Sequence, residues 1–279
     1  MNEQNFDYLA RQLKFTGFGE DHRVELLEKM HSEEPVFTIG HQANFGTDHA
    51  EAELYFRKPD TGDVYFFNGY LLRLENEKMK ETLAQSFRVG RDFSVTLKEA
   101  YNLMKRRAIH KEITPREGEK YKAWIQLNFD ETDDYGNYKF RIFHQNYGFD
   151  LRETLAGYPI RELENVESAQ SLVRSLERGN MQSVTLMVEG KEEKMFIEAS
   201  PQYKSLNLYD HYLNRYYPTG EMKISSFKKM ESNTAGSPDE GPSERQADRI
   251  QHKEKMDPQG LDGEGSSPKK SRKQNQTLS

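Results

Sequence analysis

A dense group of cations near the middle of the chain is the part of the sequence whose residue types could do chemistry. Residues 88–122 contain ten lysines and arginines against five acidic residues, whereas the whole chain has a formal net charge of -6. Cations spaced along one face neutralise the phosphates of a nucleic acid. Four of them follow one another closely at the end of an expected helix: Lys105, Arg106, Arg107 and Lys111.

Aromatic residues accompany this basic segment, and they leave two interpretations open. Tyr101, Tyr121 and Trp124 lie nearby in sequence, and base stacking on such rings is worth about 1–3 kcal/mol per base in proteins that bind single strands. One interpretation is a phosphate-tracking face. The other is a set of cations that complement a helix dipole and cover an ordinary charged sheet face.

Motifs for most other chemistries are missing from the sequence. The chain has no cysteine, which excludes disulfides, thiolate metal sites and cysteine nucleophiles. It contains no Walker loop, HExxH or GxSxG string, and residues 17–19 (GFG) lack the third glycine of a dinucleotide-binding loop. The acidic run 130–137 would place Ile142 where a calcium loop needs a glutamate. We interpret that run as a solvated hairpin turn.

Two small groups of titratable residues are weaker candidates for chemistry. His49, Glu51 and Glu53 share one face of an expected strand and could hold a cation, but ordinary polar alternation explains them equally well. Asp210 and His211 resemble half of a hydrolase triad, without an identifiable nucleophile. We therefore expect no catalytic residue, no metal and no cofactor, and we favour a protein that is not an enzyme.

The composition of the chain changes near residue 230. All 32 aromatic residues lie at or before Phe227, and residues 231–279 contain six apolar residues in total. Such a segment cannot bury enough apolar area to offset about 1–2 kcal/mol of backbone entropy per residue. We predict a folded region at 1–230 and a disordered tail at 231–279. The tail ends in a second basic cluster that we also expect to contact nucleic acid: Lys269, Lys270, Arg272 and Lys273.

The pattern of apolar residues predicts an α+β fold in which antiparallel sheet hairpins have flanking short helices. Thr96 and Glu99 form a capping box at the start of one helix, and Asp150 is the expected N-cap of another. Helices are expected at 5–13, 22–31, 96–105, 150–157 and 167–178, and strands at 50–56, 64–74, 108–113, 121–129, 138–143, 183–188 and 193–199.

The order of these elements repeats. Residues 103–129 and 176–202 both contain a helix end followed by a hairpin, about 73 residues apart. The folded region could therefore consist of two helix-plus-hairpin subunits, at about 15–145 and 146–227, or the order could simply be a common one. Within 121–129, alternation places Trp124 opposite the apolar core face, where we expect a second layer to cover it.

Six short strings in the folded region are distinctive: 64–70 (VYFFNGY), 96–103 (TLKEAYNL), 121–129 (YKAWIQLNF), 149–151 (FDL), 178–180 (RGN) and 197–202 (IEASPQ). Together they resemble an uncharacterised domain family of conjugative transposons and other mobile elements of Bacteroides and its relatives, over roughly residues 15–215. In some members the domain is fused to, or encoded near, a type IA topoisomerase. No topoisomerase module is present in this sequence, so the resemblance implies a genomic setting and not that activity.

The remaining expectations concern location and function. The mean hydropathy is -0.97, no apolar run approaches the roughly 20 residues that span a bilayer, and the first residues lack the apolar core of a signal peptide. We expect a cytoplasmic protein without a membrane partner. The predicted function is a non-enzymatic accessory protein of a mobile genetic element that binds DNA or a DNA-processing partner. The alternatives are an enzyme with an unrecognised active site and a purely protein-binding module.

Overall fold

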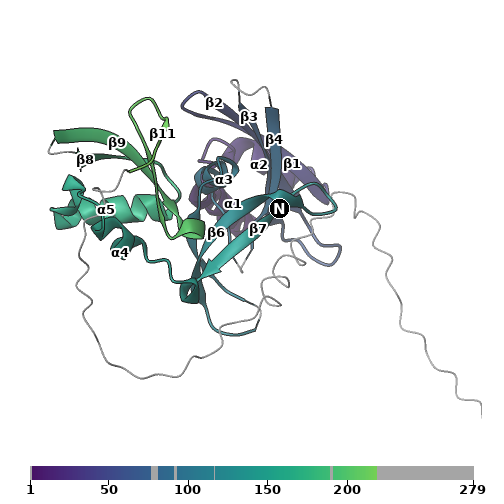
Figure 1. The fold of residues 1–279 in the computed structure, drawn as a ribbon. Coiled ribbons are helices and arrows are strands. Elements are labelled where there is room, and N and C mark those ends of the chain that lie inside the picture. The colour runs from purple at the N-terminus through teal and green to yellow at the C-terminus, as the bar shows by residue number, and fades with distance from the viewer. Residues whose placement is uncertain (1, 77–80, 91–92, 116, 189–190, 219–279) are drawn as a thin grey trace, which may run out of the picture.

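The computed structural model describes residues 2–76, 81–90, 93–115, 117–188 and 191–218 (Figure 1). The described residues contain five α-helices, and their eleven strands form three antiparallel sheets. The predicted α+β class is therefore confirmed. None of the described helices is both long and apolar enough to cross a membrane. The predicted tail at 231–279 lies outside the described residues, and so do its four candidate contacts: Lys269, Lys270, Arg272 and Lys273.

The N-terminal sheet is a four-stranded meander with two helices packed against it. Burial along its second strand alternates at every residue, as the sequence predicted for a strand with one wet face. The first and fourth strands were not predicted from sequence. The elements are α1 (Glu3–Thr16), α2 (Arg23–His31), β1 (Val36–Phe45), β2 (Asp48–Arg57), β3 (Phe66–Asn76) and β4 (Glu81–Arg88), in sheet order β1-β2-β3-β4.

The middle sheet has three strands in the order β5-β6-β7, and both of its faces are covered. Ile125 and its neighbours on one face enter the core shared with the N-terminal sheet, whereas Trp124 on the other face enters a second core. Trp124 is 5% exposed, which confirms that a second layer covers it. The elements are α3 (Leu97–Met104), β5 (Ile109–Ile113), β6 (Tyr121–Thr132) and β7 (Tyr138–His144).

The C-terminal sheet has four strands in the order β11-β10-β9-β8, and helices pack on one of its faces (Figure 1). Asp150 accepts a hydrogen bond from the backbone N–H of Glu153, so the predicted N-cap is confirmed. The elements are α4 (Leu151–Ala156), α5 (Val166–Glu177), β8 (Gln182–Val188), β9 (Lys191–Ser200), β10 (Ser205–Tyr209) and β11 (Arg215–Tyr216).

The two hydrophobic cores overlap along the chain. The first contains buried residues between Leu9 and Phe140, and the second contains residues between Ala108 and Leu208. The predicted subunit boundary at 145/146 falls between β7 and α4, but the cores do not divide there, because the middle sheet contributes to both. The repeat of element order is nevertheless present: α3-β5-β6-β7 and α5-β8-β9-β10 are both a helix followed by a three-stranded meander.

Candidate nucleic-acid interface

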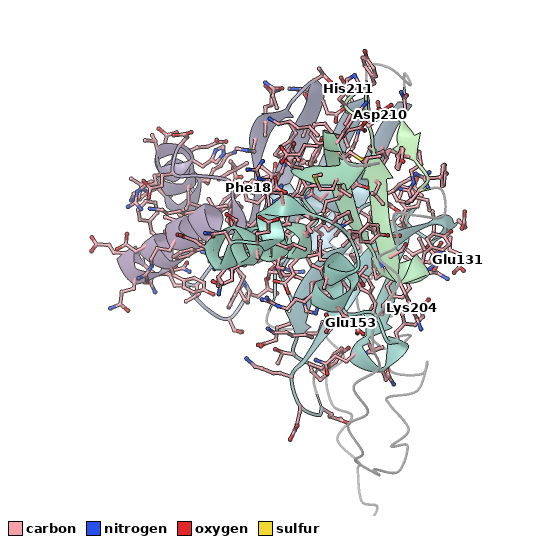
Figure 2. The ribbon with its side chains drawn as sticks, turned by 60° about the vertical axis from the view of Figure 1, so that its left-hand side comes forward. Phe18, Glu131, Glu153, Lys204, Asp210 and His211 are labelled. Carbon is pink, nitrogen blue, oxygen red and sulfur yellow. The ribbon has the colours of Figure 1, made fainter. Side chains whose placement is uncertain are left out.

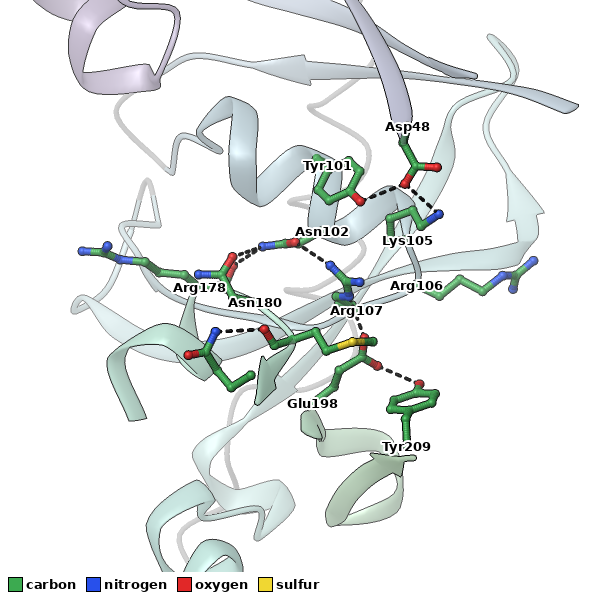
Figure 3. A network of polar contacts seen from close by, with 12 residues as sticks. Asp48, Tyr101, Asn102, Lys105, Arg106, Arg107, Arg178, Asn180, Glu198 and Tyr209 are labelled. Atoms are coloured by element: carbon green, nitrogen blue, oxygen red, sulfur yellow. Dashed lines mark hydrogen bonds and ion pairs between the residues drawn. The ribbon is translucent and has the colours of Figure 1, made fainter. Parts of the chain in front are cut away.

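Within the basic segment (residues 88–122), the chain makes a tight turn directly after α3. The capping box of Thr96 and Glu99 begins this helix, as predicted. At its end the Arg106 N–H donates to the Leu103 carbonyl (2.9 Å) and the Arg107 N–H donates to the Asn102 carbonyl (2.9 Å). Because the chain reverses within three residues, the side chains of Lys105, Arg106 and Arg107 point to different surroundings (Figure 3).

Lys105 is paired with a carboxylate from the N-terminal sheet. Its Nζ lies 3.0 Å from Oδ2 of Asp48, which follows the turn between β1 and β2. The same oxygen accepts a hydrogen bond from the Tyr101 hydroxyl at 2.8 Å. Burial, together with the bond to Asp48, raises the pKa of Tyr101 to about 12. Tyr101 is therefore a protonated donor at neutral pH.

Arg107 is paired with a carboxylate from the C-terminal sheet. Its Nε donates to Oε1 of Glu198 at 2.6 Å, and the two side chains are 13% and 9% exposed. Its Nη1 donates to Oδ1 of Asn102 at 3.0 Å, and the hydroxyl of Tyr209 donates to the other oxygen of Glu198 at 2.9 Å (Figure 3). This pair joins residues 91 positions apart and links α3 to the outer face of β9 and β10.

Lys111 is held in the same way by a nearer partner. Its Nζ lies 2.9 and 3.1 Å from the two carboxylate oxygens of Glu99, the residue that also closes the capping box of α3. Three of the four predicted contacts in the basic segment therefore lie in intramolecular ion pairs, all of them partly buried. The local positive charge counted from sequence is largely neutralised by these carboxylates.

Arg106 differs from the other three. It is exposed, its guanidinium lies 4.1 Å from the centre of the Phe129 ring, and within the described residues no carboxylate lies within ion-pair distance of it. Its backbone has a φ of +63°, a left-handed conformation that costs a residue with a Cβ about 1–2 kcal/mol. At the corresponding turn after α5, 73 residues later, the left-handed position is occupied by Gly179 with a φ of +78°.

Lys98 is a second cation that has no carboxylate within ion-pair distance in the part of the chain that the structure describes, and sequence reasoning did not single it out. Its Nζ lies 4.5 Å from the ring centres of both Phe45 and Tyr101, which are stacked on each other. Burial lowers the pKa of Lys98, and the nearby positive charge of Arg107 lowers it further. Helical spacing could have identified it, because Lys98, Tyr101 and Lys105 are i, i+3 and i+7 on α3.

The junction beneath these cations ties the two repeated units together. The side-chain amide of Asn102, which is fully buried, donates to the carbonyl of Arg178 (2.8 Å) and to Oδ1 of Asn180 (2.9 Å). Beside it, His110 of β5 lies 3.3 Å from Glu177 of α5. These contacts connect α3 and β5, which carry the basic segment, to the end of α5 and the turn that follows it.

The weaker candidates do not assemble into a site. His49 contacts Glu51 and Asn44, and within the described residues no three His, Asp or Glu side chains are arranged to hold a metal ion. Asp210 instead accepts hydrogen bonds from the backbone N–H groups of Tyr212 (2.9 Å) and Asn214 (2.8 Å) in the β10–β11 turn. In Figure 2, Asp210 and His211 lie at one end of the C-terminal sheet, away from the other labelled side chains.

Comparison with models of protein families, with curated proteins and with solved structures finds no match for this chain. The resemblance to mobile-element proteins therefore stays a prediction from the sequence.

Proposed function

We propose that the protein is a non-enzymatic accessory protein of a mobile genetic element and that it binds DNA through Arg106 and Lys98. The proposal that the protein binds DNA depends mainly on Arg106. This exposed arginine lies over the ring of Phe129, and its backbone is in the left-handed conformation that favours glycine. The mobile-element setting rests on the resemblance of the sequence strings alone.

The strained backbone at Arg106 supports a role outside folding. Residues in left-handed conformations persist where the surroundings hold them, and they concentrate at functional sites. The turn after α5 has the same shape with Gly179, so an arginine is not needed to form it. The presence of an arginine in the first turn is explained if its guanidinium contacts a ligand. A planar guanidinium beside an aromatic ring matches both parts of a nucleotide, because it binds phosphate and the ring stacks on a base.

Lys98 supports an anionic ligand in the same region. An ammonium that is partly desolvated beside Arg107, with no carboxylate among the described residues to offset it, is stabilised when an anion approaches. Lys105, Arg107 and Lys111 are left out of the proposed contacts, because Asp48, Glu198 and Glu99 largely neutralise them and these ion pairs connect parts of the fold. Removing these three cations would leave carboxylates unpaired and would confound a binding test.

The test replaces Arg106 in two ways and measures DNA binding by fluorescence anisotropy at several salt concentrations. Arg106→Gln removes the charge, and Arg106→Gly removes it while giving the turn its preferred residue. Both should weaken binding about tenfold at low salt, as expected for one charge-assisted contact of about 1.5 kcal/mol. The slope of log K against log salt should fall by about 0.7–0.9. Lys98→Gln should act in the same direction.

The glycine variant separates function from folding. Because Gly accepts the left-handed backbone, Arg106→Gly should unfold at the same or a higher urea concentration than the parent while binding DNA less tightly. Lys14→Gln is the control, since Lys14 is an exposed cation of α1 paired with Glu20. DNA affinity that is equal in the parent and in both Arg106 variants, or equally reduced in Lys14→Gln, would contradict the proposal.

A further inference from the structure

The outer face of the C-terminal sheet carries a row of aromatic and cationic side chains. Strand register places Phe196 of β9 opposite Tyr209 of β10, and Tyr209 opposite Arg215 of β11. Tyr217 directly follows β11, and its contact with the guanidinium of Arg215 places its ring beside this row. The inner face is buried against α4 and α5 by apolar residues: Val184, Leu186, Met195, Ile197, Leu206 and Leu208.

Arg215 lies over two of the rings in this row, those of Tyr209 and Tyr217. The guanidinium of Arg215 lies 5.3 Å from the ring centre of Tyr209 and 5.7 Å from that of Tyr217, and it donates to the Tyr209 hydroxyl at 3.3 Å. The same hydroxyl donates to Glu198. Tyr217 is 75% exposed, whereas Phe196 and Tyr209 are partly buried. Rings that such contacts already order, Tyr209 and Tyr217, lose less side-chain entropy when a ligand binds.

The charges around the row favour an anionic partner. Arg215 and Lys194 lie on this face, and Glu198, two residues beyond Phe196 on β9, is neutralised by Arg107. A second acid on β9, Glu192, is paired with Arg161. The face therefore keeps an excess of positive charge in a chain whose formal net charge is -6. Aromatic rings interleaved with cations on a sheet suit a polyanion that also offers flat apolar groups, and single-stranded nucleic acid has both.

We propose that this outer face, made by Phe196, Tyr209, Arg215 and Tyr217, is a stacking platform for the unpaired bases of single-stranded DNA. The inference rests on the proposed function and specifies its ligand: a duplex keeps its bases stacked inside the helix and cannot offer them to a flat sheet. The ion pair between Arg107 and Glu198 joins the platform to the segment that carries Arg106. Phosphates at Arg106 and bases on the platform would then belong to one bound strand.

The experiment compares a labelled single-stranded oligonucleotide of mixed sequence with a duplex of the same length, using the full chain and fluorescence anisotropy at low salt. Tyr217→Ala should weaken single-strand binding about tenfold and leave duplex binding unchanged, because it removes one stacking ring. Tyr217→Phe should keep the parent affinity. Phe196→Leu, which keeps an apolar side chain on β9, should act like Tyr217→Ala.

Tyr203 provides the matched control. It is 73% exposed, close to the value for Tyr217, and it lies in the short helical turn Pro201–Tyr203 that precedes β10. Tyr203→Ala should bind single strands as the parent does. Circular dichroism of each variant should match that of the parent, and a platform variant that binds less while keeping this spectrum supports the proposal.

The outcomes separate this inference from the proposed function. If Arg106→Gln weakens binding while Tyr217→Ala and Phe196→Leu leave single-strand affinity unchanged, the platform is refuted and DNA binding through the basic segment stands. If Tyr203→Ala weakens binding as much as Tyr217→Ala, or if the platform variants weaken duplex binding equally, stacking on this face is also refuted. If the parent chain binds neither form of DNA, both proposals fail.

Discussion

Replacing Gly179 by alanine should destabilise the protein strongly, because this glycine sits where the two repeated units meet. Its φ is +78°, and a Cβ built there would lie 2.9 Å from the carbonyl oxygen of Ala108 and 3.0 Å from side-chain carbons of Asn102 and Ile109. The carbonyl belongs to the chain entering β5 and cannot rotate away. We expect about 1–2 kcal/mol from the left-handed backbone and about 1–3 kcal/mol from overpacking.

Urea unfolding measures this prediction, and Gly19→Ala is its control. Gly19 has the same φ of +78° with no atom within 4 Å of an added Cβ, so that variant reports the backbone cost alone. With a slope of about 2–3 kcal/mol per molar urea, Gly179→Ala should lower the midpoint by about 1 M or more, and clearly further than Gly19→Ala. Equal shifts in the two variants would mean that the units do not pack closely at Gly179, and the description of the junction would be wrong.

Two other predictions concern stability. Gln85 of β4 is 1% exposed, accepts a hydrogen bond from the Tyr138 N–H (2.8 Å) and donates one to the Tyr138 carbonyl (3.3 Å). Gln85→Leu should lower the free energy of unfolding by about 1–3 kcal/mol, because it leaves these backbone groups without a partner. An unchanged urea midpoint would contradict this link between β4 and β7. Burial, and then the neighbouring His22, lowers the pKa of His41, so the unfolded chain binds the proton more readily and stability should fall as pH drops below about 6.5. His41→Gln should flatten that pH dependence in unfolding experiments between pH 5 and 8, and an equally steep fall in the variant would refute the assignment.

Local signals in the sequence were sufficient for most helices and for the hairpins with clear alternation. Thr96 and Asp150 are N-caps as predicted, because capping depends on residues three positions away. Two strands of the N-terminal sheet were missed for different reasons. β1 continues through polar residues after Ile39, and β4 turns Gln85 inward, where an apolar residue would have marked the strand.

The ion pairs of Lys105 and Arg107 could not be predicted, because their carboxylates are distant in sequence. Asp48 and Glu198 lie far to either side of Lys105 and Arg107, and only folding brings them together. Counting charges in a window therefore overestimated the free positive charge. The stacking row was missed for a related reason: Phe196, Tyr209 and Arg215 belong to three strands, and β10 and β11 were not expected from sequence.

The same ion pairs that reduce the free charge also determine how the two proposed contact regions act together. The ion pair between Arg107 and Glu198 connects the end of α3 to the C-terminal sheet, and we expect it to limit independent movement of Arg106 and the stacking row. A strand that contacts Arg106 would then meet the row at a high effective concentration, and modest contacts at each place would combine into useful affinity. For this reason an internally neutralised junction is compatible with DNA binding. Its ion pairs connect the two regions, and Arg106 and Arg215, which have no carboxylate partner among the described residues, remain for the ligand.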